Sequence, residues 1–316
     1  MREIGVRSTR RTARRVVIGF LYAILPGLLG VAASGSWQER PDSTDQDTLS
    51  SPAIFVDGVA TAAGDSPGSS SAVDTVEAFA FTKRENAAFG VGERLVFDIS
   101  YGFVTAGEAV MSIPAYDSVA GRQTFRVEFT VNSLPSFSWI YKVEDRYLTF
   151  IDVEALLPHR FEQHIREGSY RRDFIAEFDR TRGVAETTEG EYPILSTVHD
   201  VMSAFYFFRT LDLSERKVGD TDTLHNFYKD KSYDLLVKVL GRQEIEVEAG
   251  TFKTVVVEPF VAEGGLFKSE GRIVIWLSDD DLKIPIRVNT EIIIGSIDSE
   301  LREYSGLVGP LRARTR

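Results

Sequence analysis

The feature that most constrains the fold is an alternation of apolar and polar residues that recurs between positions 87 and 306. From Phe125 to Asn132 every second residue is apolar, and the residues between them are Arg, Glu, Thr and Asn. A period of two puts all the apolar side chains on one face of a β-strand, whereas a helix needs a period near 3.6. Runs of the same kind occupy residues 95–99, 109–113, 161–165, 172–178, 233–240, 273–277 and 284–288.

Short turn sequences separate several of these runs. They lie at residues 119–122, 166–169, 248–251 and 278–281, and contain Gly or clustered Asp. Two strands joined by a tight turn pair antiparallel. The sequence therefore predicts an all-β, mainly antiparallel fold, either a curved meander sheet or a partly open barrel or sandwich of about a dozen strands.

One segment, residues 196–211, has helical periodicity instead. Its apolar residues Val198, Val201, Met202, Phe205, Phe208 and Leu211 recur at spacings of three and four. Thr197 is the expected capping residue, with Asp200 in the first turn. A helix with so wide an apolar stripe should lie against the sheet and cover its open side.

The first 34 residues have the layout of a secretory signal peptide. Six arginines and one acid precede an uncharged apolar run at 16–33 that ends in small residues. This order is typical of general secretion, with cleavage expected after Ala33 or Ser34 and delivery to the periplasm. The alternative is an uncleaved inner-membrane anchor facing the periplasm, because about 18 residues can cross the bilayer core. In that case only residues 16–33 would contact the membrane.

The remaining organisation follows from composition. Residues 35–86 are rich in Ser, Asp and Pro and are expected to form a disordered linker, with a solvated tether favoured over docking for the apolar group at 78–81. Residues 87–306 form the expected β domain, and the basic segment 307–316 is expected to be a flexible tail.

Composition also excludes several classes of function. The chain has no cysteine, which rules out disulfides, thiolate zinc sites, iron–sulfur clusters and a thiol nucleophile. Its net charge of -11 argues against a nucleic-acid partner, and its 43% hydrophobic content predicts a packed core.

Several ordered segments resemble the DUF3108 family, a domain of unknown function found in exported bacterial proteins. The resembling segments are 95–109, 144–152 with 157–161, 199–206, 248–252, 275–280, 284–286 and 295–296. The resemblance implies an exported, mostly antiparallel β domain on the envelope side of the inner membrane. It implies no established activity and no catalytic residues.

Motifs for chemistry are scarce. The usual hydrolase, zincin and nucleotide-binding signatures are absent. His159, His164, His199 and His225 lie in separate elements, and Asp279–Asp281 fits a hairpin turn better than a calcium loop. Glu144, Asp145 and Glu162 could pair as in glycosidases, but charged side chains on the wet face of a sheet explain them more simply. We therefore predict no metal, no cofactor and no catalytic residue.

The aromatic residues carry more information. If residues 137–141 form a strand, Trp139 and Ile140 point to opposite faces, and one of them could line a second apolar surface. Core packing on both faces is the simpler interpretation, and a concave sheet that binds an acyl chain is the alternative. For the second interpretation, the expected ligand-binding residues are Trp139, Tyr141, Phe205, Phe208 and Trp276.

The sequence thus favours a noncatalytic, exported protein of the cell envelope whose curved sheet binds a lipid-like ligand or an envelope component. One alternative is an envelope scaffold or assembly protein that contacts other proteins and has no small-molecule ligand. A further alternative is a hydrolase of envelope polymers, for which Glu144, Asp145, His199 and Asp200 are the candidate residues.

Overall fold

The computed structural model describes residues 79–261, 272–292 and 294–316. The predicted signal segment at 1–34 and the predicted linker up to residue 78 lie outside this range. Within it, none of the helices has the length and apolar character needed to cross a bilayer.

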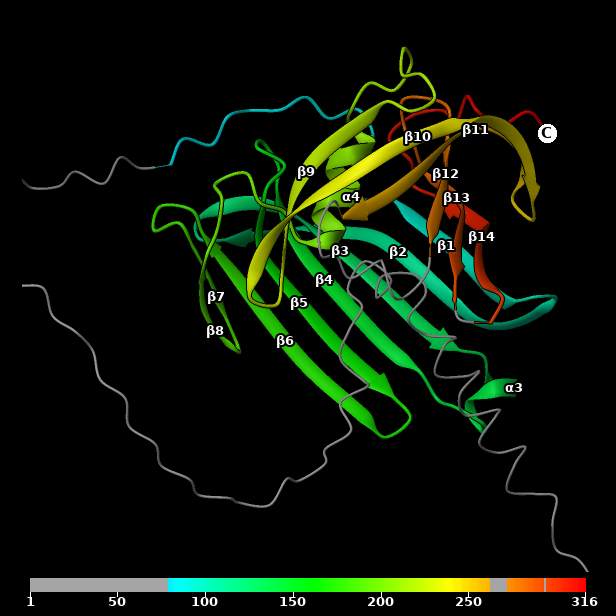
Figure 1. Cartoon of the computed structure of the whole chain (residues 1–316), viewed down its shortest axis with the longest axis horizontal. Helices are drawn as coiled ribbons and strands as arrows, with labels where there is room; N and C mark the ends of the chain where they lie inside the picture. Colours follow the sequence, from blue (N-terminus) through cyan, green and yellow to red (C-terminus); the bar gives the residue numbers. More distant parts are fainter. Residues whose placement is uncertain (1–78, 262–271, 293) are drawn as a thin grey trace, which may run out of the picture. The chain divides into compact units, whose positions relative to one another are not determined.

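The described residues form one antiparallel sheet of fourteen strands and two helices (Figure 1). The strands are β1 (Arg94–Tyr101), β2 (Val104–Val119), β3 (Arg122–Ser133), β4 (Glu144–Asp152), β5 (Pro158–Glu167), β6 (Tyr170–Asp179), β7 (Val184–Thr187), β8 (Gly190–Pro193), β9 (Thr221–Tyr228), β10 (Lys231–Val247), β11 (Gly250–Val261), β12 (Ile273–Ser278), β13 (Pro285–Glu291) and β14 (Ser296–Ser305). The helices are α3 (Pro135–Ser138) and α4 (Val201–Arg209). The order of the strands across the sheet is β8-β7-β6-β5-β4-β3-β2-β1-β14-β13-β12-β11-β10-β9.

This arrangement confirms the predicted fold class. The alternating runs fall in β1, β2, β3, β5, β6, β10, β12 and β13, and the four predicted turns join neighbouring strands. Because almost every strand pairs with the next one in the sequence, the sheet is a meander, and β14 closes against β1 to join its two halves. The sheet has two edge strands, β8 and β9, and is not closed by hydrogen bonds into a barrel.

Helix α4 lies between two layers of the core. Val201, Met202 and Tyr206 belong to a large apolar cluster built mainly on β1–β6, whereas Ala204 and Phe208 belong to a second cluster on β9–β12. The wide apolar stripe seen in the sequence is therefore used on both sides of the helix.

The helix is shorter than the sequence predicts. It begins after Asp200, whose side chain accepts hydrogen bonds from the backbone of Met202 and Ser203, so Asp200 and not Thr197 is the N-cap. Residues before it are committed to a strand-like pairing, since His199 forms a parallel bridge with Asn226 of β9. A backbone that pairs with a strand cannot also form the first helical turn.

The expected strand at 137–141 is also wrong. Residues Pro135–Ser138 form the short helix α3, with Pro135 in its first turn, and the chain then runs without regular structure to β4. Proline suits the start of a helix because it lacks the backbone donor that a strand would use. The argument that Trp139 and Ile140 face opposite sides of a strand therefore does not hold.

Both ends of the described body are more closely packed than predicted. Phe81, assigned to the linker, lies 5.3 Å from the His159 ring and under the Arg122 guanidinium. The C-terminal segment, expected to be flexible, pairs with the start of β11. Lys253 N donates to Ala313 O over 2.9 Å and Thr315 N donates to Thr251 O over 2.8 Å. This pairing is available because β12 pairs with β11 only from Thr254 to Val257.

Candidate functional site

A pocket of about 360 Å³ opens where four segments meet: the N-terminal segment 79–84, the turn between β4 and β5, α4 with the residues just before it, and β9. One set of lining residues is apolar: Phe79, Ala80, Ala155, Leu157, Phe207 and Leu224. The other set is polar: Thr82, Arg84, Thr197, His199, Thr223 and His225. None of the twelve is acidic, although the chain as a whole carries a net charge of -11.

His199 is held rigidly by its backbone. Its N–H donates to His225 O over 2.8 Å, and its carbonyl accepts from Phe227 N over 2.7 Å. His199 is only 3% exposed, and its ring centroid lies 4.8 Å from that of Phe207. Burial, followed by the nearby charges of Arg180, His225 and Arg84, lowers the pKa of His199 to about 3. The imidazole is therefore neutral near pH 7, and within the described residues its buried Nδ1 has no hydrogen-bond partner.

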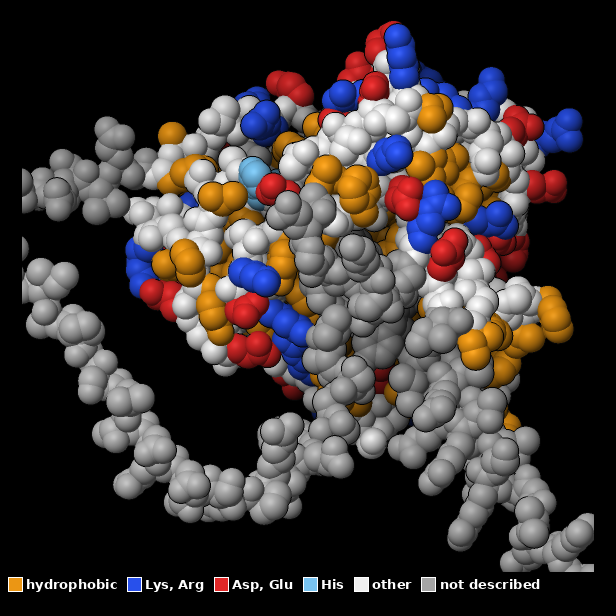
Figure 2. Space-filling view, viewed as in Figure 1, with side chains coloured by type: hydrophobic (Ala, Val, Ile, Leu, Met, Phe, Trp, Pro, Cys, Tyr) orange, Lys and Arg blue, Asp and Glu red, His pale blue; other side chains and the backbone are white. Residues whose placement is uncertain are grey.

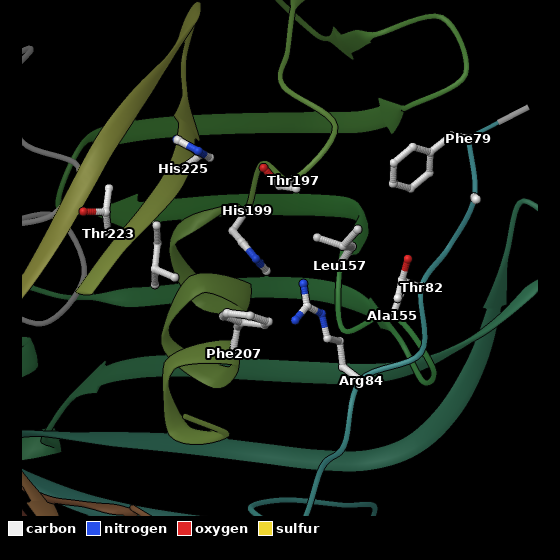
Figure 3. Close-up of a pocket in the computed structure, with 12 residues that line it drawn as sticks. Phe79, Thr82, Arg84, Ala155, Leu157, Thr197, His199, Phe207, Thr223 and His225 are labelled. Atoms are coloured by element: carbon white, nitrogen blue, oxygen red, sulfur yellow. The ribbon is translucent and has the colours of Figure 1, made fainter. Parts of the chain in front are cut away.

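Arg84 supplies the positive charge at this pocket. Its backbone N–H donates to Glu154 O over 2.7 Å, which fixes the segment against the β4–β5 turn. The guanidinium lies 5.9 Å from the centre of the Phe207 ring. Figure 3 shows the Arg84 guanidinium and the His199 ring pointing toward one another across the pocket. A cation and a neutral imidazole thus face one another across a pocket whose lining is half apolar.

The β4–β5 turn that carries Ala155 and Leu157 is under local strain. Leu156 between them is fully buried with φ of 58°, in the left-handed region that side chains disfavour. Asp152 stabilises the turn by accepting hydrogen bonds from the backbone of Glu154 and Ala155. Burial alone would raise the pKa of Asp152, but hydrogen bonds from His159 and Arg122 hold it well below its usual range. Strain of this kind persists only where surrounding contacts impose it, and it is common beside binding sites.

Behind His199, two buried ionic side chains organise the backbone. Arg180 donates to the carbonyls of Pro158, Ser196 and Val198 at 2.6–3.0 Å, and burial lowers its pKa to about 10. Asp200 accepts from Thr149 Oγ1 and Ser203 Oγ in addition to its two capping bonds, and burial raises its pKa. Since its carboxylate is occupied by the helix start and by Thr149 of β4, Asp200 is not available to join His199 as a metal ligand or an acid–base pair.

The pocket lacks the donor set that a metal needs. His225 is bound through Nδ1 to Asp234 at 2.9 Å, and His199 is the second imidazole. Across the described ranges, no group of three His, Cys, Asp or Glu side chains is placed to hold an ion. The other histidines are engaged elsewhere, His159 with Asp152 and His164 with Asp173.

The five ligand-binding residues predicted from sequence do not line this pocket. Phe208 is buried in the second core cluster, and Phe205 lines a gap of about 50 Å³ beside α4. Trp276 is half-buried under Arg287, and Tyr141 packs on Gly168. Trp139 is 81% exposed. The structure therefore does not bring these residues together.

The hydrolase candidates are dispersed as well. Glu144 is exposed and pairs with Lys142 at 2.8 Å, while Asp145 is buried beside Glu167. Burial raises the pKa of both Asp145 and Glu167, the latter to about 8, with Asp145 as the second cause. Neither carboxyl belongs to the pocket that contains His199.

Of the twelve lining residues, only His199 is among the candidate site residues predicted from the sequence, which places the segment 79–84 in the linker. The polar composition upstream extended the predicted linker over this segment. The sequence feature that could have indicated this packing is the apolar group at 78–81, because aromatic side chains at the end of a polar stretch are stabilised by packing on the neighbouring domain.

The described residues thus form a single antiparallel meander wrapped around α4, with a small pocket of mixed apolar and polar lining beside that helix. The model of the DUF3108 family, described as a protein of unknown function, matches residues 96–302. Because this match spans about two-thirds of the sequence, the chain belongs to that family.

Solved structures resemble the chain loosely. A β-barrel-like protein of the DUF1849 domain family from Brucella abortus has a TM-score of 0.46 and 14% identity, covering 69% of this chain and 99% of its own. A putative exported protein with a YmcC-like fold from Bacteroides fragilis has a TM-score of 0.29 and 11% identity, covering 69% and 98%. A putative lipoprotein from Parabacteroides distasonis has a TM-score of 0.33 and 10% identity, covering 70% and 100%. No curated protein matches the sequence significantly.

Proposed function

We propose that this protein is a noncatalytic, exported binding protein of the cell envelope, and that its pocket holds a small amphiphile with an acidic head group. The observation that supports this most directly is the mixed lining of the pocket, in which six apolar residues are accompanied by six polar ones that include Arg84 and His199 but no carboxylate. An anionic head would meet a cation and a neutral imidazole, and a short chain would lie on Phe79, Leu157 and Phe207.

The volume limits the ligand. About 360 Å³ corresponds to roughly a dozen non-hydrogen atoms if each takes the ~30 Å³ of a liquid water molecule. This suits a medium-chain fatty acid such as decanoic acid and is too small for a diacyl phospholipid. A carrier of whole phospholipids would need a larger cavity than this one.

Calorimetric titration with decanoate and with decanol tests the assignment. Wild-type protein should bind decanoate, and Arg84→Ala should weaken that binding about tenfold, because a charge-assisted hydrogen bond is worth about 1.5–3 kcal/mol and Arg84 is partly solvated. Decanol has no charge, so its affinity should change little in the same variant.

Lys83→Ala is the matched control, since it removes one positive charge from the neighbouring position, which does not line the pocket. Equal effects of the two variants on decanoate binding, or no decanoate binding by wild-type protein, would contradict the proposal. The location is tested separately: periplasmic fractionation with N-terminal sequencing should find a mature chain starting at Ser34 or Gly35. A chain that stays in the membrane with residues 1–34 attached would support the anchored alternative.

A further inference from the structure

One end of the sheet displays apolar side chains at four hairpin tips in a row. Antiparallel pairing places the turns β13–β14, β1–β2, β3–β4 and β5–β6 at the same end, in this spatial order. Each tip joins two neighbouring strands, so adjacent tips are two strand spacings apart, a distance of about 10 Å. We call this end of the sheet, with its four turns, the aromatic rim.

The residues at these tips are large and exposed. Phe103 is 99% exposed, Trp139 is 81% exposed, Ile294 is 65% exposed and Tyr170 is 44% exposed. Figure 2 shows hydrophobic side chains gathered at the edge of the molecule where Figure 1 places α3 and the β1–β2 hairpin. Single exposed apolar residues are ordinary, but their repetition at adjacent tips is not.

The tips belong to one continuous surface. Tyr101 Oη donates to Ile294 O over 3.0 Å, which joins the first two turns. Leu134 N donates to Ala106 O over 2.9 Å, and Gly168 N donates to Lys142 O over 2.8 Å, which tie the β3–β4 loop to its two neighbours. The apolar side chains are therefore held at a fixed spacing by the sheet.

Turn chemistry gives no reason for Phe103. Gly102 has φ of 59°, so the β1–β2 turn uses glycine where a left-handed residue is needed. Phe103 beside it occupies a position where Asn, Asp or Gly is favoured, and its side chain is almost wholly in water. An exposed Phe stabilises neither the turn nor the core.

Charge is nearly absent from the first three turns. The segments 101–105 and 134–141, and the described residues of 292–296, contain no charged residue, although 26% of the chain is charged. Lys142, which follows, is neutralised by Glu144 at 2.8 Å. In contrast, the opposite end of the sheet carries Asp279, Asp281 and Arg312, and the last two form an ion pair.

We propose that the aromatic rim is a membrane-docking edge that inserts Phe103, Trp139 and Ile294 into the interface of a lipid bilayer. Protruding tips of Trp, Tyr, Phe and Ile suit the boundary between head groups and acyl chains, where an amphipathic ring has one end wet and one end apolar. The lack of charge at the three tips that carry Phe103, Trp139 and Ile294 means that insertion depends on apolar area and does not need anionic lipid. This contact is additional to any made by residues 16–33 and uses a surface distinct from the pocket.

Partition into phosphatidylcholine vesicles tests the proposal, using the protein from residue 35 to residue 316, without the predicted signal segment. Wild-type protein should sediment with the vesicles at low and high salt, and its tryptophan emission should shift to shorter wavelength, a shift that Trp139→Phe should abolish. Phe103→Asp should lower the partition coefficient at least tenfold, since a large apolar side chain leaves the bilayer and a charge replaces it.

Val218→Asp is the matched control because Val218 is 72% exposed just before β9, at the opposite end of the sheet. It should bind vesicles as wild-type protein does. The proposal would be overturned if wild-type protein did not bind vesicles, or if the two variants lost vesicle binding equally. It would also be overturned if ultracentrifugation showed a dimer that Phe103→Asp dissociates, because the rim would then bind a second copy of the chain. Decanoate binding should be retained in Phe103→Asp, so this test is separate from that of the pocket.

Discussion

At the scale of single residues, the most consequential contact outside the pocket is the ion pair between Arg209 and Glu93. Both side chains are 0% exposed, and Arg209 Nη2 lies 2.7 Å from Glu93 Oε2. Arg209 also donates to the carbonyls of Ala88 and Leu282, so it connects the end of α4 to the start of β1 and to the β12–β13 turn. Three segments far apart in the sequence thus depend on one guanidinium.

Replacing Arg209 with methionine should lower the free energy of unfolding by about 3–5 kcal/mol, because Glu93 would remain buried without a partner. Urea denaturation measures this. Arg302→Ala is the control, since Arg302 is partly exposed and pairs with Asp98 and Glu108, and such pairs contribute about 1 kcal/mol or less. The double variant Glu93→Leu with Arg209→Met should recover part of the loss. An Arg209→Met protein as stable as wild type would show that the pair does not hold these segments together.

At the scale of elements, α4 shows how a sequence pattern and a structure can agree on type and differ at the boundary. Periodicity identifies the helix because the apolar side chains of α4 must reach both core clusters. The start is decided by tertiary contacts that periodicity does not contain. His199 pairs with Asn226 of β9, and Arg180 binds the carbonyls that precede the helix. The cap therefore moves to Asp200.

Asp200→Ala should lower the free energy of unfolding by about 2–4 kcal/mol. The loss combines an N-cap, worth about 1 kcal/mol, with two hydroxyls, on Thr149 and Ser203, that lose a buried acceptor. Thr197→Ala, which removes the cap that the sequence suggested, should change stability by no more than about 0.5 kcal/mol. Thermal or urea unfolding compares the two. If Thr197→Ala proved the more destabilising variant, the assignment of the cap would be wrong.

The strands were predictable and the pocket was not, for a common reason. Alternation reports which face of a strand is buried, and it depends only on neighbours two residues apart. The pocket depends on Arg84, Leu157, His199 and His225, which come from four segments whose meeting is set by the curvature of the sheet. The C-terminal tail is a similar case, because its pairing requires a gap beside β11 that no local pattern reveals.

At the scale of the whole described body, the sheet brings its two edge strands together through side chains. Tyr192 of β8 and Phe227 of β9 have ring centroids 6.4 Å apart, and Phe178 of β6 lies 5.8 Å from Phe227. Residues before α4 cover the β9 edge by the His199 pairing. An edge strand covered in this way is a poor template for aggregation. The pocket lies at the same place, where the residues before α4 pair with β9.

The same curvature encloses polar groups on the core-facing side of the sheet. Asp145 and Tyr147 alternate on β4, and Gln163 of β5 lies opposite Tyr147. Glu167, at the end of β5, is hydrogen-bonded to Asp145. Since the pKa of Glu167 is raised, Glu167 holds the proton and donates to the Asp145 carboxylate. No cation is among the causes that shift the pKa of Glu167, so this acid pair is stable only while it keeps a proton.

This arrangement predicts that stability falls as the pH rises. Glu167 has a pKa of about 8 in the folded chain against 4.5 in its ordinary state, so between these values the folded protein binds more protons than the unfolded one. The free energy of unfolding should therefore decrease with pH across this window, by up to about 1.4 kcal/mol per pH unit. Glu167→Gln keeps a donor to Asp145 and cannot ionise, so it should flatten the curve, whereas Glu144→Gln, at an exposed position, should leave it unchanged. Urea denaturation at several pH values within the window measures the slopes. Parallel curves for wild type and Glu167→Gln would show that the acid pair does not carry a proton in the folded protein.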